Sequence, residues 1–340
     1  MRVIITLAVS FALLSMGCAH SPPPAVQDAA AGEVPREGYL PGAAGARIFY
    51  RVLGNGPDTI VAVHGGPGAG MNAILSELEP LAENHTVIFY DQRGGGRSEL
   101  PQDTSLLAMR YFVDDLEALR RFFGLERMSI IAHSFGPVLV AHYAREHPER
   151  IERMVFFGAS APERAMGETM ARARSIPQDS ALLERQRRLV PKFERIDTVA
   201  DPVAFCRDLE AIIRESAVRR GEPTRWTGTT CAMPPEAVRY YFRYTARLPS
   251  GPFGDWDFTR SLRHVQAPLL VIYGALAQED LEAQRAWAAA VPDGRLLLIP
   301  GAGKGSSADR PDIFFPAVES FLAGRWPAGA EPVGPDDPAG

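Results

Sequence analysis

The chain has 340 residues, of which 46% are hydrophobic and 23% are charged, as in an ordinary globular protein. This length allows one large domain or two small ones. The net charge of −5 provides no basic surface, so nucleic acid is not expected as a partner. Beyond the N-terminus, no segment is long and apolar enough to span a bilayer.

The first 17 residues are typical of a secretory signal peptide. Arg2 provides a positive charge ahead of residues 3–14, an apolar stretch that is too short for a stable membrane span. We therefore expect export, and we exclude residues 1–17 from the folded domain.

Cys18 follows a small residue, Gly17, as the acylated cysteine of a bacterial lipoprotein does. Leu14 lies one position further from Cys18 than the usual lipobox places it. We expect a lipid anchor at Cys18 that attaches the protein to the membrane as a periplasm-facing lipoprotein of the bacterial cell envelope. The alternative is cleavage near Gly17 or Ala19, which releases a soluble periplasmic or secreted protein. Residues 18–37 are rich in Pro and Ala and are interpreted as a tether.

From residue 47 onward, short apolar runs alternate with helical patterns. Strands are predicted at 48–53, 59–63, 86–90, 128–132 and 154–157, and helices at 72–81, 106–123 and 135–146. This repeated β-α-β order predicts an α/β fold in which helices cover both faces of a mostly parallel sheet.

The alternation stops at residues 160–254, which are polar, rich in Arg and Glu, and helical in pattern. It resumes with strands at 269–273 and 295–299 and helices at 279–290 and 312–322. We interpret residues 160–254 as a helical cap inserted between two parts of one core, 38–159 and 255–322. Residues 323–340 are rich in Pro and Gly and are predicted to form a disordered tail.

Cys206 and Cys231 are the cysteines that remain once the N-terminal segment is set aside. An oxidising compartment permits a disulfide between them, and closing a loop of about 25 residues would stabilise the fold by about 3 kcal/mol. The alternative is a pair of buried free thiols. We expect the disulfide, because the cysteines are even in number and export is predicted.

Ser134 lies between the predicted strand 128–132 and the predicted helix 135–146, which is the setting of a nucleophile elbow. Ala132 stands where such a turn usually has glycine. The backbone amide of Phe135 lies at the start of the helix, where partial positive charge favours an oxyanion. We predict that Ser134 is a nucleophile; the alternative is an ordinary strand–helix turn.

The sequence HGGPG at 64–68 follows the predicted strand 59–63. Its glycines allow backbone amides to approach a ligand closely, and the Gly66 amide is our candidate for a second oxyanion donor. We expect His64 to brace the loop rather than act as a base. His133 is also expected to be structural, because the alternation of side chains along a strand would point it away from Ser134.

Three stretches in this order resemble α/β-hydrolases of the prolyl iminopeptidase group: HGGPG at 64–68, DQRGGGRS at 91–98, and the elbow at Ser134. The resemblance covers residues 38–322. It implies an eight-stranded sheet with a helical cap and a Ser-Asp-His triad, without a metal or another cofactor. It also implies removal of N-terminal residues, often proline, from short peptides, or cleavage of small esters and amides.

Carried over to this chain, the resemblance makes Ser134 the nucleophile and gives the oxyanion hole to the amides of Gly66 and Phe135. Residues Asp91, Arg93 and Ser98 match a motif that we interpret as bracing the loops around the site.

The acid and the base of the triad do not carry over. In the resembled family the acid lies three residues after the glycine that ends its strand, and counting from Gly274 gives Ala277. Glu279 and Asp280 are alternatives for the acid, but both lie at the start of a predicted helix, where acidic residues are common. The position of the base, in the pattern G-x-G-H, is occupied by Lys304.

A histidine cannot be restored by a small shift of the alignment. The seven histidines are at 20, 64, 85, 133, 142, 147 and 264, all well before Lys304. Two hypotheses remain open. In the first, Lys304 is the proton acceptor of a Ser-Lys hydrolase. In the second, the protein is an inactive pseudo-hydrolase that binds a ligand or an envelope partner.

The cap offers several acidic residues that could hold the amine of a peptide substrate, as acidic cap residues do in the resembled peptidases. They are Glu163, Glu168, Glu210, Glu215, Glu222 and Glu236. Trp226, Tyr240, Tyr241 and Tyr244 could line a pocket or simply pack the cap against the core. The sequence does not choose among them.

Overall fold

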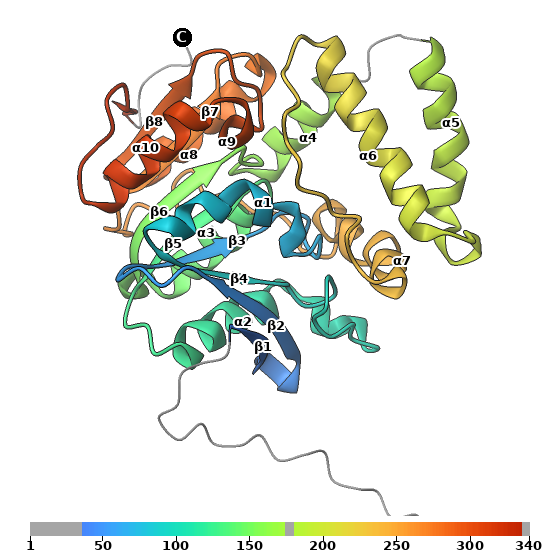
Figure 1. Ribbon diagram of the computed structural model, residues 1–340, viewed down its shortest axis with the longest axis horizontal. Helices are drawn as coiled ribbons and strands as arrows, with labels where there is room; N and C mark the ends of the chain where they lie inside the picture. The colour runs from blue at the N-terminus through green and yellow to red at the C-terminus, as the bar shows by residue number, and fades with distance from the viewer. Residues whose placement is uncertain (1–35, 174–179, 335–340) are drawn as a thin grey trace, which may run out of the picture. The chain divides into compact units, whose positions relative to one another are not determined.

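A single sheet runs through the described part of the chain, residues 36–173 and 180–334 of a computed structural model (Figure 1). Its strands are β1 (Glu37–Pro41), β2 (Arg47–Leu53), β3 (Thr59–Val63), β4 (Thr86–Tyr90), β5 (Met128–His133), β6 (Ile151–Phe157), β7 (Leu269–Gly274), β8 (Gly294–Ile299) and β9 (Glu331–Pro332). They lie in the order β1-β2-β4-β3-β5-β6-β7-β8-β9. Neighbours from β4 to β8 are parallel, whereas β1, β2 and β9 pair in the antiparallel sense.

Helices cover both faces of the parallel strands. They are α1 (Leu75–Leu78), α2 (Met109–Phe122), α3 (Gly136–Glu146), α8 (Leu281–Ala290), α9 (Ser306–Asp309) and α10 (Pro311–Leu322). Consecutive strand residues point to opposite faces. Ile130 accordingly belongs to the cluster formed with α2, α3 and α8, and Ile131 to the cluster formed with α10. The two apolar layers explain why the strands read as continuous hydrophobic runs.

The predicted cap lies between β6 and β7 in the chain. Its helices are α4 (Arg164–Ala173), α5 (Ser180–Glu194), α6 (Pro202–Arg219) and α7 (Pro235–Arg243). Figure 1 shows α5, α6 and α7 grouped to one side of the sheet. Leu182, Phe205, Val238 and Phe242 form a hydrophobic cluster separate from those of the sheet. The cap therefore has a small core of its own.

The structure differs from the sequence prediction at three places. Residues 72–81 do not form one helix. The single turn of α1 is followed by a separate 3-10 turn, Glu79–Glu83, which has Pro80 near its start. The sheet has nine strands among the described residues rather than eight. The third difference concerns the C-terminal segment.

Residues 323–334 are not the disordered tail that their Pro and Gly content predicted. Trp326 packs against Phe321, with ring centroids 4.9 Å apart, and beneath the guanidinium group of Arg295 at 4.5 Å. The strand β9 then pairs with β8. The aromatic contacts and the strand pairing together hold a segment whose Pro- and Gly-rich composition predicted disorder.

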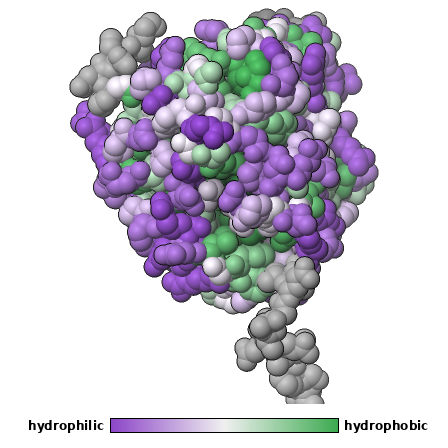
Figure 2. Space-filling model, turned by 60° about the vertical axis from the view of Figure 1, so that its left-hand side comes forward, coloured by the Kyte–Doolittle hydropathy of each residue, from purple (hydrophilic) through white to green (hydrophobic). Residues whose placement is uncertain are grey.

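The predicted signal peptide 1–17, the lipidation site Cys18 and the tether up to residue 35 lie outside the described residues. No described helix has the length and apolar character needed to cross a membrane. The face in Figure 2 is mostly hydrophilic, with smaller patches of hydrophobic residues between the polar ones.

Candidate active site

Ser134 occupies a strained turn between β5 and α3. Its backbone φ is 57°, in the left-handed region that residues with side chains rarely adopt. The turn fits because its neighbours are glycines: a β-carbon on Gly65 would lie 2.7 Å from the Ser134 β-carbon, and one on Gly136 would lie 2.6 Å from the Val63 carbonyl oxygen. The Ser134 carbonyl oxygen accepts a hydrogen bond from the Ser160 amide at 2.7 Å. These contacts hold the serine in the geometry of a nucleophile elbow.

The amides of Gly66 and Phe135 are available for an oxyanion. Phe135 directly precedes α3, so its amide lies at the positive end of that helix. No described residue accepts a hydrogen bond from either amide. Gly66 and Ser134 line the same pocket, whereas the Phe135 ring packs away against Phe253 and Trp256. Both amides thus remain able to donate to an oxyanion.

His64 braces the loop that carries Gly66. Its Nδ1 donates to the Gly65 carbonyl oxygen at 2.6 Å, and its Nε2 accepts from the Gln92 amide at 3.1 Å. These two bonds assign the neutral tautomer with the proton on Nδ1. Complete burial lowers the pKa of His64 to about 4. His64 is therefore a neutral structural residue, as expected.

The motif at 91–98 also braces the site. The Asp91 carboxylate accepts hydrogen bonds from the amides of Met71 at 2.6 Å and Arg97 at 2.8 Å. The Ser98 hydroxyl donates to the Asp91 carbonyl oxygen at 2.6 Å. Arg93 is fully buried and forms a two-point ion pair with Asp115, both bonds being 2.6 Å long. None of these side chains lines the pocket beside Ser134.

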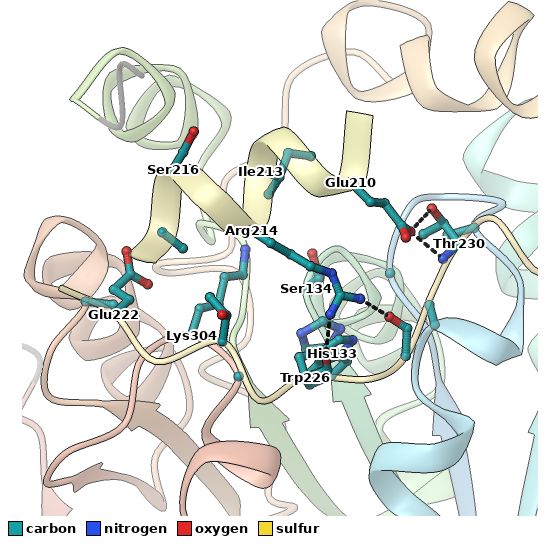
Figure 3. Close-up of a pocket in the computed structure, with 18 of the residues that line it drawn as sticks. His133, Ser134, Glu210, Ile213, Arg214, Ser216, Glu222, Trp226, Thr230 and Lys304 are labelled. Atoms are coloured by element: carbon teal, nitrogen blue, oxygen red, sulfur yellow. Dashed lines mark hydrogen bonds between the residues drawn. The ribbon is translucent and has the colours of Figure 1, made fainter. Parts of the chain in front are cut away.

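The two positions that depart from a Ser-Asp-His triad line the same pocket as the serine. Ala277 follows β7 and is part of the lining. Lys304 follows β8 and lines the pocket with Ser134 (Figure 3). This pocket has a volume of about 550 Å³. Ala277, the residue located by its spacing from Gly274, therefore lies in the same pocket as Ser134 and Lys304.

The sequence pattern of the alpha/beta hydrolase fold matches residues 58–311. The chain belongs to the alpha/beta hydrolase fold family. The predicted fold class is thereby confirmed.

Proline iminopeptidases are among the similar curated proteins. That of Heyndrickxia coagulans is 35% identical over 121 residues, which cover 35% of this chain and less than half, 42%, of that relative. That of Xylella fastidiosa is 28% identical over 303 residues, covering 81% of this chain and 93% of the relative. That of Saccharolobus solfataricus is 22% identical over 288 residues, covering 81% and 87%. The protein is therefore prolyl iminopeptidase-like in sequence and fold.

Solved structures show the same fold. A proline iminopeptidase from Mycobacterium smegmatis superposes with a TM-score of 0.61 at 23% identity, covering 85% of this chain and 98% of that one. An esterase from Thermogutta terrifontis superposes with a TM-score of 0.60 at 22% identity, covering 85% and 99%.

His133 does not point away from the serine as strand alternation predicted. It lines the same pocket as Ser134, because the chain turns sharply at φ 57° and the alternation ends there. Its ring stacks on Trp226, with centroids 4.5 Å apart, and contacts Phe157 at 4.8 Å. Burial, together with the positive charge of Lys304, lowers the pKa of His133 well below the usual value. The pocket therefore holds a neutral imidazole next to the serine in sequence.

Asp280 has a different role from the helix-terminal acid predicted for it. Its side chain is buried and makes no cap hydrogen bond to α8. Instead it accepts a hydrogen bond from the Tyr273 hydroxyl at 2.5 Å and lines the pocket. Its spacing of six residues from Gly274 gave no reason to prefer it over Glu279, whose side chain lies outside the described part of the structure.

The roof of the pocket is formed by α6 and by residues 220–234, which we call the cap loop. Cys206 on α6 and Cys231 in the cap loop form a disulfide. Glu77, a buried residue of α1, accepts hydrogen bonds from the Thr227 amide at 2.6 Å and the Gly228 amide at 2.9 Å. Nothing in the sequence near Glu77 signalled this contact between core and cap.

Two of the six candidate cap acids, Glu210 and Glu222, line the pocket. Trp226 and Tyr241 also line it, whereas the Tyr240 hydroxyl donates to the Pro101 carbonyl oxygen at 2.7 Å. The remaining cap acids and Tyr244 do not contribute to the lining. Which of the candidate residues face the pocket is therefore set by the packing of segments that are distant in the sequence.

A group of potential metal ligands lies at the disulfide. Among the described residues, Cys206, Glu210 and Cys231 place candidate ligand atoms within 4.8 Å of one another. The disulfide removes both thiolates, which are the species that bind metals. These residues therefore do not fit a metal ion while the disulfide is intact.

Proposed function

We propose that this protein hydrolyses small ester, amide or peptide bonds through Ser134, with Lys304 as the proton acceptor. The observation that carries the proposal is the strained φ of 57° at Ser134, next to the amides of Gly66 and Phe135 and in one pocket with Lys304. Strained backbone conformations of this kind cluster at active sites.

The proposed reaction starts with transfer of the Ser134 hydroxyl proton to a neutral Lys304 amine while the serine oxygen attacks the substrate carbonyl carbon. The Gly66 and Phe135 amides stabilise the resulting oxyanion. The protonated lysine then donates the proton to the leaving group as the tetrahedral intermediate collapses. Water attacks the acyl-serine through the same proton transfer and releases the acid.

The reaction should be slow at neutral pH and faster in alkaline solution. An ordinary lysine has a pKa of about 10.4, so at pH 7 only about one in a thousand such side chains is in the neutral amine form. The oxyanion hole and substrate binding alone supply roughly 10³- to 10⁴-fold over the uncatalysed reaction. Activity near pH 7 should therefore approach this lower limit.

A fluorophosphonate probe that reacts with nucleophilic serines tests the proposal. We expect labelling of Ser134 that speeds up as the pH rises, because a larger fraction of a lysine base is then neutral. Lys304→Arg keeps the positive charge but cannot accept a proton, so it should abolish this pH dependence. Ser134→Ala is the control for labelling elsewhere. The absence of labelling at every pH up to about 10 would exclude the proposed chemistry.

A second candidate function is that of a pseudo-hydrolase that binds a ligand or an envelope partner. Ala277 favours it, because this pocket residue has no carboxylate where the resembled family has the triad acid. In this case a panel of esters and aminopeptides would show no turnover, and a ligand would still raise the melting temperature. Turnover that is abolished by Ser134→Ala would exclude this function.

We also propose that the protein is exported and anchored through Cys18. The Cys206–Cys231 disulfide supports export, because such bonds persist in oxidising compartments. Expression of the full chain in bacteria with a labelled fatty acid tests the anchor. We expect label on the wild-type protein and none on Cys18→Ala; equal labelling of both would refute lipidation at this residue.

A further inference from the structure

Arg214 is a pocket residue with unused hydrogen-bonding capacity. It lies on α6, and its guanidinium group donates to the carbonyl oxygens of Trp226 and of Gly228, the latter at 2.9 Å. An arginine carries five N–H groups, so three remain. No described residue accepts a hydrogen bond from them, and no described carboxylate forms an ion pair with Arg214. In Figure 3 the side chain extends across the pocket in front of Ser134.

The acid of α6 that lines the same pocket, Glu210, does not neutralise this charge. Glu210 precedes Arg214 by four residues, a spacing that commonly gives ion pairs. Its carboxylate instead accepts three hydrogen bonds from the cap loop, from the Thr229 hydroxyl at 2.7 Å, the Thr230 amide at 2.8 Å and the Thr230 hydroxyl at 2.7 Å. Glu210 therefore has little capacity left for a ligand.

The other carboxylates of the pocket also have partners within the protein. Glu222 pairs with Arg220 at 2.8 Å. Asp309 accepts from the Gly303 amide at 2.9 Å. Asp280 accepts from the Tyr273 hydroxyl, as described above. Carboxylates outnumber cations in the lining, so net charge does not decide what binds. What binds depends on which charged groups still have hydrogen bonds to offer, and Arg214, with three unused N–H groups, is such a group.

The rest of the pocket fits a small and partly apolar molecule. Its volume of about 550 Å³ is in the range of small-molecule sites. Trp226 and the neutral His133 provide flat surfaces, and Ile213, which is 67% exposed, lies at the rim. A planar guanidinium with free N–H groups binds a carboxylate through two parallel hydrogen bonds.

We propose that Arg214 binds the carboxylate of a small, partly aromatic or aliphatic substrate and so directs the substrate's ester or amide carbonyl to Ser134. The identity of the bond that is cleaved rests on the proposed function, whereas recognition of the carboxylate does not. The preferred substrates are thus esters and amides that carry a carboxylate, rather than the free-amine peptides that Glu210 or Glu222 would recognise.

Three para-substituted phenyl acetates test the inference. They carry a carboxymethyl group, a methyl group or an aminomethyl group, so that one is an anion, one is neutral and one is a cation. The kcat/KM of each ester is divided by its spontaneous hydrolysis rate, which removes differences in leaving-group acidity. The variants are Arg214→Gln, Arg214→Lys and Arg207→Gln. Arg207 is an exposed arginine of the same helix and serves as the matched control.

We expect wild-type protein and Arg207→Gln to prefer the carboxymethyl ester over the methyl ester by about 10- to 100-fold, the range of a charge-assisted hydrogen bond. Arg214→Gln should reduce this ratio to about one, and Arg214→Lys should retain part of it. If Arg214 only held the cap loop, its loss would slow both esters equally and leave the ratio unchanged. An unchanged ratio, or a preference for the aminomethyl ester, would overturn the inference.

Calorimetric titration of the Ser134→Ala protein separates this inference from the proposed function. We expect the carboxymethyl ester to bind at least tenfold more tightly than the methyl ester, and Arg214→Gln in the same background to remove the difference. Selective binding without turnover in wild-type protein would refute the hydrolase and keep the inference. Turnover without selectivity would refute the inference and keep the hydrolase.

Discussion

Gly274 at the end of β7 lies against the backbone of Gly303 in the loop after β8. A β-carbon at Gly274 would come within 2.1 Å of the Gly303 carbonyl oxygen and 2.2 Å of the Ala302 carbonyl oxygen. The Leu276 amide also donates to the Ala302 carbonyl oxygen at 3.0 Å. The two loops that carry Ala277 and Lys304 are thus joined backbone to backbone, and the position of one fixes that of the other.

Gly274→Ala should displace the loop that carries Lys304. The added methyl group meets backbone atoms that cannot rotate away, so the free energy of unfolding should fall by about 1–3 kcal/mol. Fluorophosphonate labelling of the folded protein should slow at least tenfold. Gly167→Ala is the control, because its β-carbon would meet only the Ala161 β-carbon at 3.6 Å. Wild-type labelling and stability in Gly274→Ala would contradict the contact between the loops.

The double variant Ala277→Asp, Lys304→His should raise activity at neutral pH. A histidine is largely neutral at pH 7 and a neighbouring carboxylate orients it, so general-base catalysis would contribute about 10²- to 10⁴-fold. Initial rates of ester and aminopeptide hydrolysis between pH 6 and pH 10 measure the gain, with each single variant as a control. The alkaline rise expected of wild type should give way to a plateau near neutrality. No gain at pH 7 would mean that the positions are misassigned or that the pocket lacks another requirement.

Stability should fall in acid because His64 is buried in its neutral form. Its pKa is about 4 in the folded protein and about 6.5 in the unfolded chain, so between these values only the unfolded chain binds the proton. The free energy of unfolding is therefore unaffected by His64 above pH 6.5. It decreases as the pH falls towards 4, by about 2 kcal/mol between pH 7.5 and pH 5.

Urea unfolding at these two pH values measures the loss. Because burial also lowers the pKa values of His133 and His142, the comparison with His64→Asn isolates the contribution of His64. This variant keeps a donor for the Gly65 carbonyl oxygen and should lose about 2 kcal/mol less between the two pH values. An NMR titration in which His64 becomes protonated near pH 6.5 would be inconsistent with this account.

Removal of the Cys206–Cys231 disulfide should loosen the cap. The bond closes a sequence separation of 25 residues, so Cys206→Ser, Cys231→Ser should lower the free energy of unfolding by about 3 kcal/mol. Reduced wild type should behave like this variant, and the variant itself should not respond to a reductant. Equal stability of oxidised and reduced wild type would show that Glu210, Arg214 and Glu77 hold the cap loop without help.

The sequence alone determined the features that depend on neighbouring residues. The β-α-β alternation, the elbow at Ser134 and the glycine loop at Gly66 are local patterns, because strand period, turn and helix start are set within a few residues. The positions of Ala277 and Lys304 also followed from their spacing to the ends of β7 and β8. A disordered tail was predicted at 323–340, whereas in its described part, 323–334, Trp326 packs against Phe321 and Arg295 and β9 pairs with β8.

Tertiary structure decided everything that depends on segments far apart in the chain. It packed Trp226 of the cap loop on His133, buried Asp280 against Tyr273, and placed Glu210 and Glu222, out of six acidic candidates, in the pocket lining. It also left Arg214 with hydrogen bonds to offer, because its neighbour Glu210 was taken by the cap loop. Which donors and acceptors bond to each other is set only when helices and loops pack. Periodicity and spacing in the sequence therefore could not show which polar groups would remain without a partner.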